Sequence, residues 1–201
     1  RKVFISWWTN IRFEKTFTAE LCSLMAKSGC IAVTGGLEVA ADRLLTKMKK
    51  GVDIGQVARV TNDFADQNIM VHAYLMYGFP TETEQETIDS LEVVRQLFEN
   101  GCIHSAFWHK FTTTVHSPIG KNPDQFEITI TGPKFKGFAE NDLTHNDPTG
   151  ANHDLYTHGL NLALNNYLNG LDIDISVHEW FDFEVPPTTL PSNLIGGFLE
   201  D

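Results

Sequence analysis

Two short turns in this sequence carry residue types that suit a nucleoside ligand. The first turn contains Gly36 and Glu38, and the second contains Met76 and Gly78. Glycine lets a backbone approach a ligand closely, and an acidic side chain can accept hydrogen bonds from the two hydroxyls of a ribose. Met76 offers soft apolar surface for a base, and Gly78 leaves room above it. These residues suggest an adenosine-like ligand, although tight turns beside a solvated Glu38 would explain the same pattern.

The elements around these turns predict how the turns meet. Four apolar runs are typical of buried strands, and they occupy residues 3–8, 30–34, 69–76 and 102–111. Helical patterns lie between them, and the helix after the second turn opens with a capping box from Thr83 to Glu86. This order, β-α-β-αα-β-α-β, predicts a parallel sheet with right-handed crossovers. Because ligands bind at the carboxyl ends of parallel strands, the two turns should lie side by side.

The composition changes after Asn122 and Pro123, which predicts a boundary between residues 1–123 and residues 124–201. In the second part, residues 126–131 alternate apolar and polar types, as in a half-exposed antiparallel strand or hairpin. Residues 173–183 alternate in the same way, and a helical pattern runs from about residue 153 to residue 169. We therefore expect a small α+β appendage after the α/β part.

The totals of the sequence disfavour several kinds of partner and site. The 201 residues carry a formal net charge of −11, which argues against nucleic acid and anionic membranes. No apolar run approaches the roughly 20 residues of a membrane helix. Cys22, Cys30 and Cys102 form no metal motif, so we expect buried free thiols, no metal, and a cytoplasmic location. The sequence has no initiator Met or secretory signal and reads as a piece of a longer protein.

Five segments, in order and in spacing, resemble the later half of a radical SAM domain across residues 1–123. They are Trp8–Glu14, Ser28–Cys30, Gly36–Glu38, Leu45–Gly51 and Gly78–Thr83. The likeness is greatest to a subgroup that often carries an upstream cobalamin-binding domain and includes magnesium-protoporphyrin monomethyl ester cyclase-like proteins. It implies a partial (β/α) barrel with about four parallel strands, the third to sixth of six. In such enzymes a 4Fe-4S cluster reduces S-adenosylmethionine, and the resulting radical abstracts hydrogen from a small-molecule substrate.

The resemblance also implies roles for particular residues. Glu38, in the Gly36–Glu38 segment, would meet the ribose of S-adenosylmethionine, and Met76 and Gly78 would contact its adenine. Arg12 could pair with the methionine carboxylate, although an arginine two positions before Glu14 is as often a surface ion pair.

Two further residues follow from the expected barrel. Its inward positions would face the substrate, so Trp108 or His109 could touch it. His104, His109 and His116 are spaced too widely for a shared metal ion.

One departure from the family pattern bears on activity. The cluster motif CxxxCxxC is absent, and the three cysteines present cannot replace it. The resemblance therefore implies a fragment that lacks the cluster and cannot generate the radical by itself. We expect the motif upstream in a full-length parent, which could also bind cobalamin.

Two other classes of function remain open at this stage. One is a nucleotide-binding or scaffold module that uses the same turns without redox chemistry. The other is a barrel hydrolase with Glu38 and Glu82 as a carboxylate pair, although Glu82 sits where an acid is favoured for capping alone. In a half-barrel the first strand would expose unpaired backbone groups. We therefore expect self-association through that edge, or its covering by the carboxyl-terminal segment.

Overall fold

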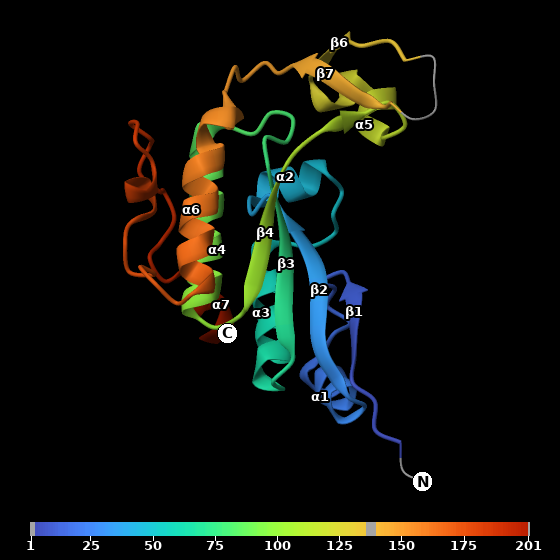
Figure 1. The fold of residues 1–201 in the computed structure, drawn as a ribbon, viewed down its shortest axis with the longest axis vertical. Coiled ribbons are helices and arrows are strands. Elements are labelled where there is room, and N and C mark those ends of the chain that lie inside the picture. Colours follow the sequence, from blue (N-terminus) through green and yellow to red (C-terminus); the bar gives the residue numbers. More distant parts are fainter. Residues whose placement is uncertain (1–2, 136–139, 201) are drawn as a thin grey trace.

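The computed structural model describes residues 3–135 and 140–200. A four-stranded parallel sheet with helices against one face forms the larger part, and a small antiparallel sheet lies beyond its carboxyl end (Figure 1). The strands of the large sheet are β1 (Trp7–Ile11), β2 (Cys30–Glu38), β3 (Met70–Tyr77) and β4 (Ser105–Lys110). The connecting helices are α1 (Ala19–Lys27), α2 (Asp42–Lys47), α3 (Ile54–Asp66) and α4 (Glu84–Glu99). The predicted order of elements is confirmed.

The large sheet has the strand order of one wall of a barrel. Its strands follow the order β1-β2-β3-β4, and each neighbouring pair is parallel. Consecutive strands that are also neighbours, with helices on one side, occur in barrels rather than in doubly wound sheets. The expected four parallel strands are therefore confirmed. The sheet is open, with β1 and β4 at its two edges, so the described residues do not close a barrel.

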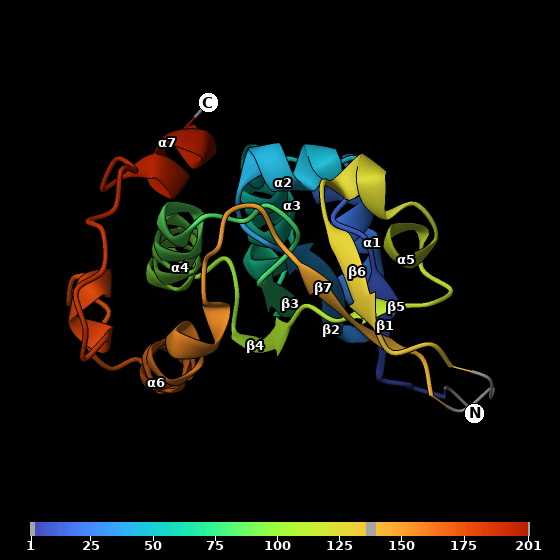
Figure 2. The ribbon, with the colours of Figure 1, turned by 90° about the horizontal axis from the view of Figure 1, so that it is seen from above.

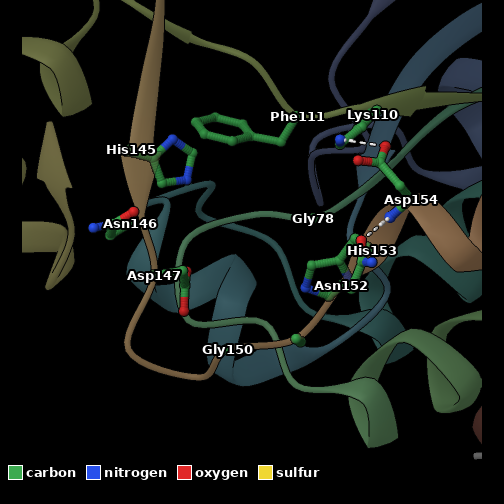
Figure 3. A pocket seen from close by; sticks show the side chains of 11 residues that line it. Gly78, Lys110, Phe111, His145, Asn146, Asp147, Gly150, Asn152, His153 and Asp154 are labelled. Carbon is green, nitrogen blue, oxygen red and sulfur yellow. Dashed lines mark hydrogen bonds and ion pairs between the residues drawn. The ribbon is translucent and has the colours of Figure 1, made fainter. Parts of the chain in front are cut away.

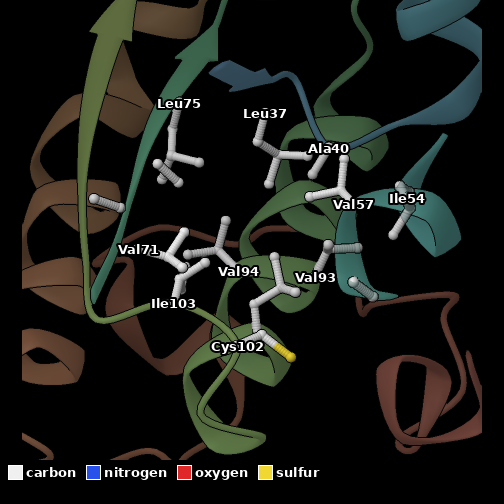
Figure 4. Packing of buried hydrophobic residues seen from close by; sticks show 14 of the residues in the cluster. Leu37, Ala40, Ile54, Val57, Val71, Leu75, Val93, Val94, Cys102 and Ile103 are labelled. Carbon is white, nitrogen blue, oxygen red and sulfur yellow. The ribbon is translucent and has the colours of Figure 1, made fainter. Parts of the chain in front are cut away.

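Alternation along the strands separates a covered face from an open one. Val71, Ala73 and Leu75 of β3 are almost fully buried, and they pack in one cluster with residues of α3 and α4 (Figure 4). Tyr74 of the same strand is 44% exposed on the other face. Successive residues of a strand point to opposite faces. One face of the sheet is thus filled by helices and the other is left uncovered.

The first strand lies further along the chain than predicted. Residues 3–6 are exposed and form no strand, and β1 begins at Trp7, which pairs with Cys30. An apolar run becomes a strand only where a neighbour offers backbone partners, and β2 begins at Cys30. Just before Trp7, the chain passes the end of α1, where Ile5 lies against Gly29. A Cβ on Gly29 would lie 2.1 Å from the carbonyl oxygen of Ile5, and Gly29 has φ +97°.

The small antiparallel sheet has the order β5-β7-β6. Its strands are β5 (Thr113–Thr114), β6 (Thr129–Gly132) and β7 (Asp142–Asn146), and α5 (Pro118–Lys121) and η1 (Pro123–Phe126) lie between the first two. Seen from above, β6 and β7 pass over the ends of the large sheet (Figure 2). A second apolar cluster joins the two parts, because Phe79 after β3 packs with Ile119 and Ile128.

The last third of the chain completes the helical layer. It contains η2 (His153–Tyr156), α6 (Thr157–Leu168), η3 (Val177–Trp180) and α7 (Leu194–Glu200). Residues 173–183 hold only η3 and no strand, because Trp180 turns back and donates to Tyr167 Oη at 2.9 Å. Tyr167 and Ile195 belong to the same buried cluster as the large sheet. Strand β5, which precedes residue 123, belongs to the small sheet, and residues 156–200 pack on the larger core. The expected division into residues 1–123 and 124–201 stays a prediction.

The thiols, the open edge of the large sheet and the lengths of the helices were also subjects of prediction. The cysteines are buried and free, as predicted. At the open edge, β1 pairs only with β2 within residues 3–135 and 140–200. The carboxyl-terminal helix α7 packs on α3 and α4 and does not cover that edge, so this alternative was wrong. No helix in the part of the chain that the structure describes is long and apolar enough to cross a membrane.

Candidate nucleoside site

The carboxyl ends of β2 and β3 meet, as the order of elements predicts. Gly36 pairs with Tyr74, and after a shift of register Glu38 pairs with Leu75. Gly78 follows β3 directly. Neighbouring strands of a sheet lie about 4.8 Å apart, so both turns lie at the same end of the sheet. We call the end of the sheet formed by Gly36–Glu38 and Met76–Gly78 the rim.

Glu38 is held in a polar corner of the rim. Its Oε1 lies 2.5 Å from Lys50 Nζ, and both side chains are about one fifth exposed. A Cβ on Gly36 would lie 2.2 Å from Glu38 Oε1 and 2.9 Å from Lys50 Nζ. Glycine at this position therefore makes room for the ion pair. Glu38 itself has φ +64°, a conformation that costs a non-glycine residue roughly 1–3 kcal/mol and clusters at functional sites.

Arg12, directly after β1, contacts the same corner. Its Nη2 donates a hydrogen bond to the carbonyl oxygen of Lys50, and its Nε lies 3.3 Å from Glu14 Oε1. Arg12 therefore braces the loop that carries Lys50 and also forms the surface ion pair that was the alternative interpretation. Both contacts occupy the guanidinium within the chain, so its pairing with a ligand carboxylate stays a prediction.

Met76 and Gly78 border the other half of the rim. Met76 is half-buried and packs against the cluster that contains Phe79 and Ile128. Gly78 has φ +77°, so its backbone conformation alone favours glycine. A Cβ there would lie 3.4 Å from the Cβ of His153, an ordinary contact. The space above Gly78 is thus bounded by a residue from far along the chain.

A cavity of about 400 Å³ opens beside Gly78 (Figure 3). His145 and Asp147 lie on one side of it, and Lys110, Asp154 and His153 lie on the other. Lys110 and Asp154 form an ion pair across 2.5 Å. Volumes of this size hold small ligands, and the lining here is mostly polar. The cavity extends the rim toward β4 and the segment after β7.

Residues 147–154, which we call the strap, are fastened to the turn that follows β3. The backbone N–H of Thr81, a residue with φ +69°, donates to Asp147 Oδ2 at 2.6 Å. That hydrogen bond and those from Thr149 lower the pKa of Asp147 against the opposing effect of burial. His153 Nε2 lies 3.2 Å from the carbonyl oxygen of Glu82. The strap therefore covers one side of the Gly78 turn.

Trp108 and His109 lie on opposite faces of β4. Trp108 is 4% exposed and packs edge-on against Tyr77 on the helix-covered face. His109 lies on the open face, with its ring 4.6 Å from that of Phe107 and 5.7 Å from that of Tyr74. If a substrate lies against the open face, His109 can reach it and Trp108 cannot. Contact of either residue with a substrate stays a prediction.

Neither a metal site nor a Glu38–Glu82 carboxylate pair forms in the part of the chain that the structure describes. Among residues 3–135 and 140–200, no three His, Cys, Asp or Glu side chains come together as metal ligands would. Glu82 is fully buried, and its carboxylate accepts from Thr87 Oγ1 at 2.7 Å and from the N–H of Phe79 at 2.9 Å. Both oxygens of the Glu82 carboxylate are bound within the turn after β3 and the start of α4. Glu82 therefore cannot act on a ligand together with Glu38.

Comparisons with known proteins identify the fold. The chain is similar to a solved structure of the radical S-adenosylmethionine methyltransferase TsrM from Kitasatospora setae with cobalamin and a [4Fe-4S] cluster bound. The TM-score is 0.55 at 16% identity, over 80% of this chain and 36% of that chain. A second TsrM structure, with tryptophan substrate and the SAM analogue aza-SAM, gives a TM-score of 0.54 at 15% identity, over 80% and 35% of the two chains.

At this level of sequence identity, the likeness establishes the fold alone. The chain has a radical SAM-like fold and spans about a third of the length of the structures it matches. No protein-family model matches the sequence, and no curated protein matches it.

Several residues of the site are absent from the sequence-based prediction. Lys50 and Asp147 are two of them. Their contacts join residues 12 and 66 positions apart in the chain. The sequence holds one signal for Lys50, because the Glu38 carboxylate needs a cation to pair with if it is removed from water. Nothing in the local pattern pointed to the strap.

Proposed function

We propose that this chain is the carboxyl-terminal part of a radical SAM barrel and that its rim binds the adenosyl group of S-adenosylmethionine. The observation that carries the proposal is the register of β2 and β3, which brings Glu38 beside the Gly78 turn in a fold shared with a radical SAM methyltransferase. In the full-length parent, the bound S-adenosylmethionine would be cleaved reductively and a substrate hydrogen abstracted. The relation to magnesium-protoporphyrin monomethyl ester cyclase-like proteins belongs to the same proposal.

The chemistry of the rim fits a ribose and a base. Lys50 occupies Oε1 of Glu38, and within the described residues Oε2 makes no hydrogen bond, so it can accept one from a ribose hydroxyl. The half-buried Met76 presents thioether and methylene surface for an adenine ring. Gly78 keeps the backbone beside that ring free of a side chain. Each of these contacts uses an atom that this chain itself supplies.

The residues described do not fit an iron-sulfur cluster. Cluster ligands are thiolates, whereas burial raises the pKa of Cys22 and Cys102 to about 11 and also raises the pKa of Cys30. No step through the cluster therefore follows from these residues. In this proposal the CxxxCxxC motif lies elsewhere in the full-length parent, and the chain alone generates no radical. Cobalamin, which the first TsrM structure contains, is a further cofactor the parent could bind.

A second candidate function is a nucleotide-binding or scaffold module without redox chemistry. It is favoured by one observation, namely that residues 3–135 and 140–200 offer no cluster ligands. The two candidates differ in what the full-length parent does. A parent with an upstream CxxxCxxC motif supports the enzyme, and a parent without it supports the module.

The proposal is tested in the full-length parent under reducing conditions. The assay measures formation of 5′-deoxyadenosine and the KM for S-adenosylmethionine in the wild type, in Glu38→Ala and in Glu14→Ala. Loss of a hydrogen bond to a charged group costs roughly 1.5–3 kcal/mol, so Glu38→Ala should raise KM about 10- to 100-fold. Glu14→Ala removes a nearby exposed carboxylate and should leave KM unchanged. An unchanged KM in Glu38→Ala would refute the ribose role.

A further inference from the structure

A partly buried chain of hydrogen bonds joins the strap to the start of α4. Glu82, at 0% exposure, accepts from Thr87 Oγ1 at 2.7 Å. Thr87 Oγ1 in turn lies 3.3 Å from His153 Nδ1. The other ring nitrogen, His153 Nε2, lies 3.2 Å from the carbonyl oxygen of Glu82. A carboxyl, a hydroxyl and an imidazole therefore form one continuous network between the turn and the strap.

The number of protons in this network follows from the chemistry of its atoms. A backbone carbonyl only accepts, so His153 Nε2 must carry a proton. The hydroxyl of Thr87 has a single proton to give. If Glu82 is ionised, that proton goes to Glu82, and His153 Nδ1 must then be protonated as well. If Glu82 is protonated, it donates to Thr87, which donates to a neutral His153.

Both complete arrangements contain the same number of protons. Each holds one proton more than ionised Glu82 with neutral His153. Without that proton, the Thr87 hydroxyl donates to ionised Glu82, and His153 Nδ1 carries no hydrogen. No hydrogen then lies between Thr87 Oγ1 and His153 Nδ1, so the hydrogen bond between them is lost. With one proton more, Glu82 and His153 both donate toward Thr87, and its own proton has only the carbonyl oxygen of Thr83, at 3.3 Å, to turn to. The network is complete only when it holds one shared proton.

We propose that Glu82, Thr87 and His153 share one proton, and that this proton latches the strap onto the turn after β3. Its loss above neutral pH would free His153 from Thr87 and loosen the strap over the cavity beside Gly78. The second anchor, from Thr81 N–H to Asp147, is unaffected by this proton. The latch is independent of which nucleoside, if any, binds at the rim.

The charges around the network favour its neutral arrangement. Burial is the main effect on both groups: it raises the pKa of Glu82 to about 7 and lowers the pKa of His153. Glu86 adds to the rise for Glu82, and Lys110 adds to the fall for His153. Opposing, smaller effects on His153 come from its hydrogen bond to the backbone of Glu82 and from the carboxylates of Asp147 and Glu84. Two cations of α2 also lie near Glu82: Arg43, and Lys47, whose Nζ donates to Thr81 Oγ1 at 3.1 Å.

Hydrogen exchange of the strap amides, measured from pH 5.5 to pH 9 and expressed as protection factors, tests the latch. Losing one hydrogen bond corresponds to about fivefold weaker protection. In the wild type, protection should fall about fivefold as pH rises past about 7. Glu82→Gln keeps a donor toward Thr87 at every pH, so its strap should stay protected at pH 9. Glu20→Gln removes an exposed carboxylate on α1, outside the network, and should behave as the wild type.

Two variants at Thr87 and one spectroscopic measurement complete the test. Thr87→Val removes the hydroxyl and should give weak protection at every pH, while Thr87→Ser should restore the wild-type profile. Long-range 1H–15N spectra of His153 should report a change in the ring between pH 6 and pH 9 that is absent in Thr87→Val. Wild-type protection that does not vary with pH would overturn the proposal. So would a Glu82→Gln strap that loosens at alkaline pH as the wild type does.

Discussion

Replacing Glu82 with glutamine should change how the protein's stability depends on pH. Burial raises the pKa of the Glu82 carboxyl from 4.5 to about 7, against smaller lowering effects of the hydrogen bonds from Thr87 and from the Phe79 and Gly78 backbone. Between these two values the folded protein binds a proton that the unfolded chain releases. The stability that depends on this proton is fully present below pH 4.5 and is lost as pH rises through about 7. Glutamine does not titrate, so the variant should lack this loss.

The magnitude follows from the width of that interval. Each pH unit between the unfolded and folded pKa values corresponds to about 1.4 kcal/mol of unfolding free energy. From 4.5 to about 7 this amounts to roughly 3 kcal/mol. Domains of ordinary size are stable by about 5–15 kcal/mol, so the effect is a large fraction of the total.

Urea unfolding followed by circular dichroism, from pH 4.5 to pH 8, measures the effect. The free energy of unfolding should fall by roughly 3 kcal/mol more in the wild type than in Glu82→Gln over this range. Glu84→Gln removes an exposed carboxylate two residues away and should follow the wild type. Parallel curves for the wild type and Glu82→Gln at every pH would contradict a raised pKa of Glu82, because Glu82 would then titrate alike in the folded and unfolded states.

Three other outcomes are expected. Arg95→Ala should lower the unfolding free energy by about 3–5 kcal/mol in urea titrations. The reason is that the buried carboxylate of Glu92, which lies 2.8 Å from the Arg95 guanidinium, is left without a cation. A loss below about 1 kcal/mol would contradict this. Gly29→Ala should destabilise by more than about 1 kcal/mol on heating, since the new Cβ would lie 2.1 Å from Ile5 O at φ +97°, and an unchanged melting temperature would contradict it. Within the described residues one edge of β1 has no partner strand, and it lies beside the exposed Phe4, so we expect concentration-dependent self-association in light scattering. A monomer at all concentrations would exclude it.

The sheet could be predicted because its signals are local. Apolar runs that stop at a glycine, such as the one ending before Gly78, define strands and their order, and the capping box from Thr83 to Glu86 forms as its spacing indicates. The start of β1 could not be predicted, because it depends on where β2 offers backbone partners. Trp108 and His109 are adjacent on a strand and therefore face opposite ways, but the sequence analysis left both as possible substrate contacts. It could not show which of them faces the helices.

The candidate site was predictable only in part, for a physical reason. Gly36, Glu38 and Gly78 meet because parallel strands end together, which follows from topology. Lys50 reaches Glu38 from a loop, and His153 reaches Glu82 across 71 positions in the chain. Such contacts depend on how distant segments pack and leave no periodic pattern in the sequence. The ion pair and the strap therefore became visible only in three dimensions.

The central claim is that Glu38 and Gly78 border one site for an adenosyl group. Amide chemical-shift mapping of this chain with S-adenosylhomocysteine tests it most directly. We expect weak, saturable shifts confined to residues 36–38, 76–78 and their neighbours, which Glu38→Ala abolishes and Glu14→Ala preserves. Shifts that fall elsewhere, or that persist unchanged in Glu38→Ala, would contradict it.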